Sequence, residues 1–198
     1  MPRPPRVFSA EAAYHIISRG NNRQSLFKRP EDFRYFLFIL RELKREYQFY
    51  VYHYCLMTNH VHLLLQFDNG IAFQKVPQRL NLLYAKYFSR TYQHVGHVFQ
   101  DRFKSLLVGD NTYLLECGRY IERNPVKAKM VSTPDSYEWS SFRFYADNLS
   151  NDLLTPNPLY LDISSSNEER QEKYKSYVTG ERPYDAAMEK IIFGKFKN

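Results

Sequence analysis

Hydrophobic residues recur along the chain with two different spacings, and these predict a mixture of helices and strands. Helical spacing of Phe and Leu predicts a helix over 30–46, a second helix is expected over 71–93, and a third begins at the capping residue Asn111. The third helix is expected to end near Asn124 or shortly after, because Pro125 has no backbone N–H to donate. Aromatic and β-branched runs predict four strands, over 13–18, 49–56, 60–67 and 103–109.

The order of these elements predicts the fold class. It reads β-α-β-β-α-β-α, and the first six elements spell the split βαβ, or ferredoxin-like, arrangement. We therefore expect an α+β protein with an antiparallel sheet, two helices on one face, a further helix after the sheet, and the first and third strands in the centre. Residues 1–150 are expected to form this domain, and the more polar residues 151–198 an extension with one surface helix.

Charge and composition narrow the choice of partners. The 198 residues carry a formal charge of +7, with an isoelectric point near 9.3, which favours a polyanion such as nucleic acid but also fits an ordinary basic protein. Two scattered cysteines, no long apolar segment and no signal peptide in "MPRPPRVFSAE" predict a soluble, cytoplasmic protein.

Two histidines stand out in the strand over 60–67. Side chains alternate across a strand, so His60 and His62 share one face while Val61 and its apolar neighbours face the other way. Residues two apart on a strand have Cα atoms ~6.6 Å apart, close enough for two imidazoles to converge on one metal ion. The alternative is that both are hydrogen-bonded strand histidines. Cys55 is a further possible ligand of a structural zinc ion.

The predicted third helix carries a second candidate group. Tyr120 and Asn124 lie four residues apart, one helical turn from each other. An amide oxygen is a plausible hard ligand to complete a site begun by two imidazoles, and it would bring the phenol to the same ion. A metal ion, a tyrosine and a basic surface together suggest phosphodiester chemistry, although a phenol with a reference pKa of ~10 needs help to attack at neutral pH.

Five segments, in order, resemble one known family. These are "YHIISRGNNRQSLF", "YHYCLMTNHVHLLLQ", "VGHVFQDRFKSLLV", "RYIERNPVKAKMV" and "WSSFRFY", which span residues 14 to 146. The sequence is similar to the REP-associated tyrosine transposases, which belong to the single-strand DNA transposases with a His–hydrophobic–His (HUH) motif. The resemblance implies that His60 and His62 hold Mg²⁺ or Mn²⁺, that Tyr120 is the nucleophile, and that Asn124 is a third ligand where relatives can carry Gln.

The resemblance also implies a reaction and a partner. Tyr120 would cleave single-stranded DNA beside a REP-like hairpin through a 5′-phosphotyrosine and later rejoin the strands, acting as a monomer in preference to a homodimer. Arg19, Asn21 and Arg23 are candidates for recognising the site, and Arg102 and Lys104 for contacting phosphates; each is also explained as a solvated loop residue. Two other functions remain open: a non-catalytic binder of single-stranded nucleic acid, and a structural metal protein.

Overall fold

The computed structural model describes residues 8–10, 12–109 and 111–180, and for residues 111 and 112 it describes the backbone alone. The sheet has four antiparallel strands in the order β2-β3-β1-β4. The strands are β1 (Ala13–Arg19), β2 (Phe49–Met57), β3 (His60–Phe67) and β4 (Lys104–Val108). The helices are α1 (Pro30–Tyr47), α2 (Gly70–Tyr92), α3 (Asn111–Lys127), α4 (Phe142–Ala146), α5 (Pro158–Leu161) and α6 (Asn167–Thr179), with short 3₁₀ turns η1 (Asn21–Arg23) and η2 (Pro134–Ser136). The predicted ferredoxin-like order, with the first and third strands central, is confirmed.

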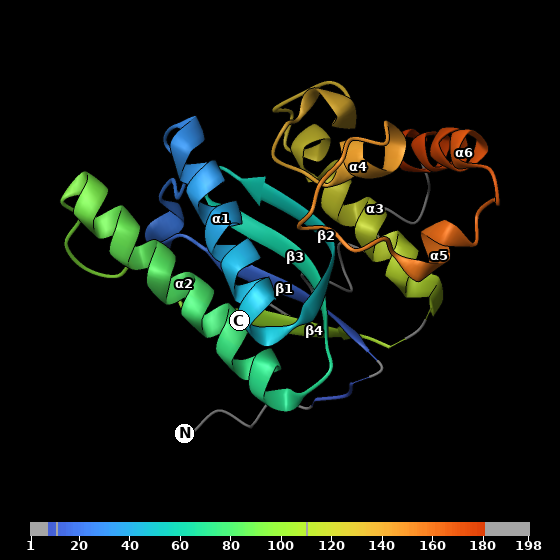
Figure 1. The fold of residues 1–198 in the computed structure, drawn as a ribbon. Helices are drawn as coiled ribbons and strands as arrows, with labels where there is room; N and C mark the ends of the chain where they lie inside the picture. Colours follow the sequence, from blue (N-terminus) through green and yellow to red (C-terminus); the bar gives the residue numbers. More distant parts are fainter. Residues whose placement is uncertain (1–7, 11, 110, 181–198) are drawn as a thin grey trace.

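The two faces of the sheet carry different helices. Helices α1 and α2 cover one face, and α3 lies against the other with α4, α5 and α6 beyond it (Figure 1). The alternation of β3 follows this division. Val61, Leu63 and Leu65 are buried in the cluster under α1 and α2, whereas Leu64 is buried in the cluster under α3. His62 therefore points toward α3, as the alternation predicts.

A bulge in β2 aims one more side chain at α3. Val51 lies opposite Leu65, and the next paired residue, His53, lies opposite Leu64, so one extra residue is inserted between them. The insertion reverses the alternation and brings His53 onto the same face of the sheet as α3. His53 is fully buried there.

Gly118 of α3 is the residue that lets the helix approach His53. A Cβ atom added at Gly118 would lie 2.5 Å from His53 Nε2 and 2.7 Å from two ring carbons, closer than such atoms pack. Because α3 also carries Tyr120, the close approach of Gly118 helps to set how near the phenol lies to the sheet.

We expect Gly118→Ala to destabilise the protein by about 1–3 kcal/mol, although alanine is otherwise the better helix former. The added methyl group must displace either α3 or the buried ring. Urea unfolding measures the change, with Gly70→Ala at the start of α2 as the control, since there the new atom meets only Phe8 at 3.4 Å or more. A stabilised Gly118→Ala variant would contradict the close packing described above.

Helix α3 runs further than the sequence predicts. It passes through Pro125 and ends at Lys127. Proline cannot donate to the carbonyl of Ile121, one turn before it, but the side-chain amide of Asn124 donates to that carbonyl at 3.2 Å and to the carbonyl of Tyr120 at 2.9 Å. The side chain replaces the missing bond, which explains why the helix continues to Lys127, three residues past Asn124.

The chain after residue 150 folds back on α3. Tyr174 and Val178 of α6 are fully buried in a cluster with residues of α4. The guanidinium of Arg123 donates to the carbonyls of Val178 and Thr179 at 2.7 and 2.9 Å, where the last turn of α6 leaves its acceptors unpaired. The domain boundary near residue 150 stays a prediction. Within the described ranges, no helix combines the length and the apolar character needed to cross a membrane.

Candidate functional site

His60 and His62 lie side by side on β3, on the face that α3 covers. Their ring centroids are 4.9 Å apart, and Arg19 of β1 lies directly opposite His60 in the ladder. Burial, with a smaller contribution from Arg19, lowers the pKa of His60 from 6.5 to about 4. Burial also lowers the pKa of His62 well below its ordinary value. Both rings are therefore neutral at neutral pH, which is the form that binds metal ions.

Among the residues that the structure describes, the Nδ1 atoms of both rings have hydrogen-bond partners and the Nε2 atoms do not. His60 Nδ1 lies 2.7 Å from Asn59 Oδ1, and His62 Nδ1 lies 2.8 Å from Nε2 of His15, a buried residue of β1. Within the described residues His60 Nε2 makes no hydrogen bond, and His62 Nε2 is buried without a partner. A buried nitrogen without a partner is costly unless something binds it. The pair therefore fits a divalent metal ion bound through the two Nε2 atoms.

Tyr120 of α3 lies against His62 and His15. Its ring centroid lies 6.0 Å from that of His62 and 6.1 Å from that of His15, edge-on to both. The ammonium of Lys127 lies 4.8 Å from the centre of the Tyr120 ring, a cation–π contact that the sequence pattern did not indicate. The side chain of Tyr120 is only 3% exposed. The structure thus brings His60, His62 and Tyr120 together.

Asn124 lies one turn beyond Tyr120 and is also buried. Since its amide nitrogen is occupied by backbone carbonyls of α3, Oδ1 is the atom that can serve as a ligand. In the part of the chain that the structure describes, no group of three or more His, Cys, Asp and Glu side chains converges as a metal site. Cys55 lies opposite His62, but its thiol points to Met57 Sδ at 3.6 Å, and burial raises the pKa of that thiol well above its ordinary value.

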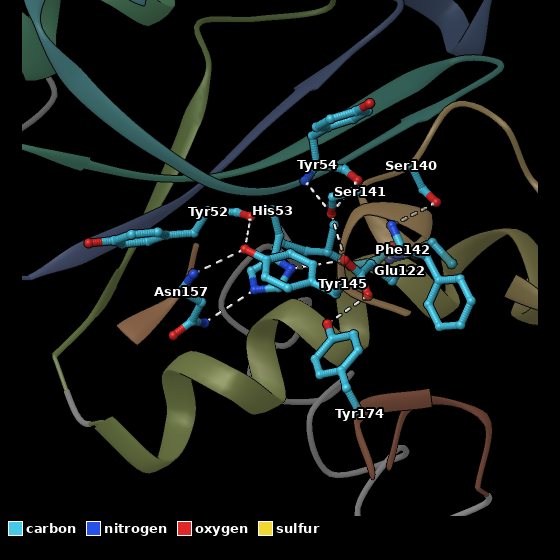
Figure 2. A network of polar contacts seen from close by, with 12 residues as sticks. Tyr52, His53, Tyr54, Glu122, Ser140, Ser141, Phe142, Tyr145, Asn157 and Tyr174 are labelled. Carbon is cyan, nitrogen blue, oxygen red and sulfur yellow. Dashed lines mark hydrogen bonds and ion pairs between the residues drawn. The ribbon is translucent and has the colours of Figure 1, made fainter. Parts of the chain in front are cut away.

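A buried carboxylate fixes α3 on the sheet (Figure 2). Glu122 is fully buried and accepts hydrogen bonds from His53 Nδ1 at 2.9 Å, Ser141 Oγ at 2.6 Å and Tyr174 OH at 2.7 Å. Nε2 of His53 in turn accepts from the amide of Asn157 at 3.2 Å. The contacts join β2, the residue just before α4, and α6 to a residue two positions from Tyr120, so they hold the phenol in place relative to β3.

The candidate DNA-binding residues divide into two groups. Arg19 lies beside His60, and the loop that follows it is tied to the hairpin: the backbone N–H of Gly20 donates to the Asn59 carbonyl at 2.8 Å, and the Asn59 amide donates to the Arg23 carbonyl at 3.2 Å. Arg19, Asn21 and Arg23 are all exposed.

The second group lies at the edge strand. Lys104 of β4 lies opposite Ile17, so it shares the α3 face of the sheet with Arg19. Arg102 is exposed just before that strand.

Comparison with known proteins is informative at the level of the family. The model of the family described as "Transposase IS200 like" matches residues 8–124, more than half of the chain. The chain belongs to the IS200-like transposase family. Among curated proteins, no sequence matches it. A solved structure of a REP-associated tyrosine transposase bound to a REP hairpin superposes on this transposase with a TM-score of 0.60 and 18% identity, over 78% of this chain and 94% of that one. That likeness supports the fold.

The buried histidines of this transposase predict loss of stability in mild acid. Burial lowers the pKa of His15 to about 3, whereas in the unfolded chain it lies near 6.5. Between these values the unfolded chain binds more protons, so the free energy of unfolding falls as the pH falls, by up to about 1.4 kcal/mol per pH unit for each such histidine. His62 adds to this slope.

Urea unfolding from pH 7 downward, with a chelator present, measures the effect. His97→Gln, at an exposed position, is the control and leaves the slope unchanged. A wild-type stability that is flat between pH 6.5 and about 4 would contradict the burial of neutral imidazoles.

Proposed function

We propose that this transposase nicks and rejoins single-stranded DNA beside a hairpin, using Tyr120 as the nucleophile and a divalent metal ion held by His60 and His62. The observation that carries the proposal is the placement of a tyrosine, 6.0 Å between ring centroids, against a histidine whose buried Nε2 has no hydrogen-bond partner among the described residues. No other described tyrosine lies within ring contact of His62.

The reaction needs a nucleophile and a group that stabilises the negative charge that develops on the phosphate oxygens. Tyr120 Oη would form a bond to phosphorus as the bond from phosphorus to the 3′ oxygen breaks, so that the phenol loses its proton and the departing strand gains a 3′-OH. Attack by another 3′-OH reverses these changes and restores the free tyrosine, and it needs no ATP because each step exchanges one phosphate ester bond for another. A divalent ion bound at the histidines would stabilise the charge that develops on the phosphate oxygens.

The residues around the site have separate parts in this proposal. Asn124 would supply Oδ1 as a third ligand, and Lys127 would add positive charge beside the phenol. The DNA next to His60 would be contacted by Arg19, Asn21 and Arg23. Its phosphate backbone would run along the edge strand β4 and be contacted there by Arg102 and Lys104. Two imidazoles intrinsically favour Zn²⁺ over Mg²⁺. We therefore propose that the availability of ions in the cell, and not intrinsic affinity, selects Mg²⁺ or Mn²⁺ for this site.

Incubation with labelled oligonucleotides tests the proposal. Single-stranded DNA that carries a hairpin and flanking arms, taken from a broad set including the host's own repeats, is mixed with the protein and Mn²⁺ or EDTA and run on a denaturing gel. We expect a covalent adduct and a strand with an extendable 3′-OH, only with the ion, and neither when the same strand is annealed to its full complement. Binding without any adduct would replace the proposal with a non-catalytic single-strand binder.

A further inference from the structure

His15 was not expected to belong to the site, yet it makes the hydrogen bond that holds His62. It lies on β1 with 1% of its surface exposed, and its ring meets that of His62 edge to edge, with centroids 5.0 Å apart. Its Nε2 is 2.8 Å from His62 Nδ1. A neutral imidazole carries one N–H, so in this pair one nitrogen donates and the other accepts.

The neighbouring His60 shows how such a bond selects a tautomer. The amide nitrogen of Asn59 donates to the carbonyl of Arg23, which leaves Asn59 Oδ1 to face His60 Nδ1 at 2.7 Å. A carbonyl oxygen only accepts, so His60 carries its proton on Nδ1 and keeps a lone pair on Nε2. A metal ion can bind only the nitrogen with the lone pair.

We infer that His15 is a positioning residue that accepts a hydrogen bond from His62 Nδ1–H and so presents the lone pair of His62 Nε2 to the metal ion. The inference rests on the proposed function. In the opposite arrangement, with His15 donating, the proton of His62 would sit on Nε2 and block the ion. Both arrangements leave His15 Nδ1 and His62 Nε2 without protein partners among the described residues, but only the first lets a bound ion occupy one of these two atoms.

In this arrangement each metal-binding histidine donates its Nδ1–H to a neighbour, and the two neighbours come from different elements of the fold. Asn59 fixes His60 from the hairpin, and His15 fixes His62 from the neighbouring strand. Removing such a hydrogen-bond partner of a metal ligand typically weakens metal binding by roughly 10- to 100-fold. His15 touches neither the ion nor the DNA in this account.

Metal binding without DNA tests the role of His15. Titration of the full chain with Mn²⁺, followed by calorimetry, is expected to show roughly 10- to 100-fold weaker binding for His15→Phe, which keeps a ring but cannot accept. His15→Gln should bind nearly as the wild type does, because its Oε1 lies the same number of bonds from the backbone as the lost nitrogen and accepts. Leu64→Met, opposite His15 in the ladder and in the buried cluster that also contains Tyr120, is the control for packing and should not weaken binding.

The tautomer itself can be read by NMR of ¹⁵N-histidine-labelled wild-type protein without metal, even if a variant fails to fold. We expect the His62 proton on Nδ1; a proton on Nε2 would overturn the inference. Equal Mn²⁺ binding by the wild type and His15→Phe would remove the role of His15 alone. A wild type that binds no Mn²⁺ would remove the proposed metal centre and this inference with it.

Discussion

Replacing Tyr120 with Phe is expected to abolish the covalent protein–DNA adduct and to leave the fold and DNA binding intact. Phenylalanine keeps the ring that packs against His62 and His15 but removes the hydroxyl group that we propose attacks phosphorus. Loss of a nucleophile removes the covalent route altogether, so we expect cleavage to fall by at least roughly 10³-fold. The denaturing gel with labelled hairpin DNA and Mn²⁺ measures the adduct, and fluorescence anisotropy measures binding.

Tyr113→Phe is the matched control for this experiment. Tyr113 lies on the same helix, two turns earlier, with 44% of its surface exposed, and nothing places its hydroxyl near the histidines. It should form the adduct as the wild type does. An adduct that persists in Tyr120→Phe would show that another residue attacks the DNA and would contradict the assignment of the nucleophile.

Removing the carboxylate of Glu122 is expected to lower the free energy of unfolding more than Gly118→Ala does. In Glu122→Leu the buried donors of His53, Ser141 and Tyr174 would lose their shared acceptor. Each buried donor that is left without an acceptor costs about 1–3 kcal/mol, so we expect the three together to cost about 3–5 kcal/mol. Glu122→Gln keeps the shape and one acceptor oxygen, so a loss of only about 1–2 kcal/mol is expected. Urea unfolding at neutral pH measures both changes.

Glu172→Leu supplies the comparison for Glu122→Leu. Glu172 is exposed on α6, where such a change usually alters stability by less than about 0.5 kcal/mol. If Glu122→Leu cost no more than this, the network in Figure 2 would not be what holds α3 on the sheet. In variants that remain folded, adduct formation should fall as well, because Glu122 lies two positions from Tyr120.

Much of the fold could be predicted because its signals are local. Side-chain alternation put His60 and His62 on one face, and the order of elements predicted a sheet with its first and third strands central. The end of α3 could not be predicted in the same way. Pro125 is a strong local signal for a helix end, and only the structure shows that the Asn124 side chain takes over the missing backbone bond.

The residues that position the site, His15 and Glu122, act through contacts between parts of the chain that are distant in the sequence. His15 lies 47 residues from His62, and only the register of β1 against β3 shows that they meet. The one available signal was a single histidine inside the apolar run "AYHIIS". For Glu122 the signal was Gly118, four residues earlier on the same helix, since glycine inside a helix usually marks a close approach. Neither signal shows which residues His15 and Glu122 contact in the folded protein.

The family match ends at residue 124, but the partners of Glu122 do not. Ser141 and Tyr174 come after that point, and so does Asn157, which holds His53. A fragment trimmed to the matched residues would keep His60, His62 and Tyr120, yet the carboxylate of Glu122 would lose two of the three groups that bind it. The smallest piece of this chain suited to expression alone, or to fusion with another DNA-targeting protein, therefore extends at least through the end of α6.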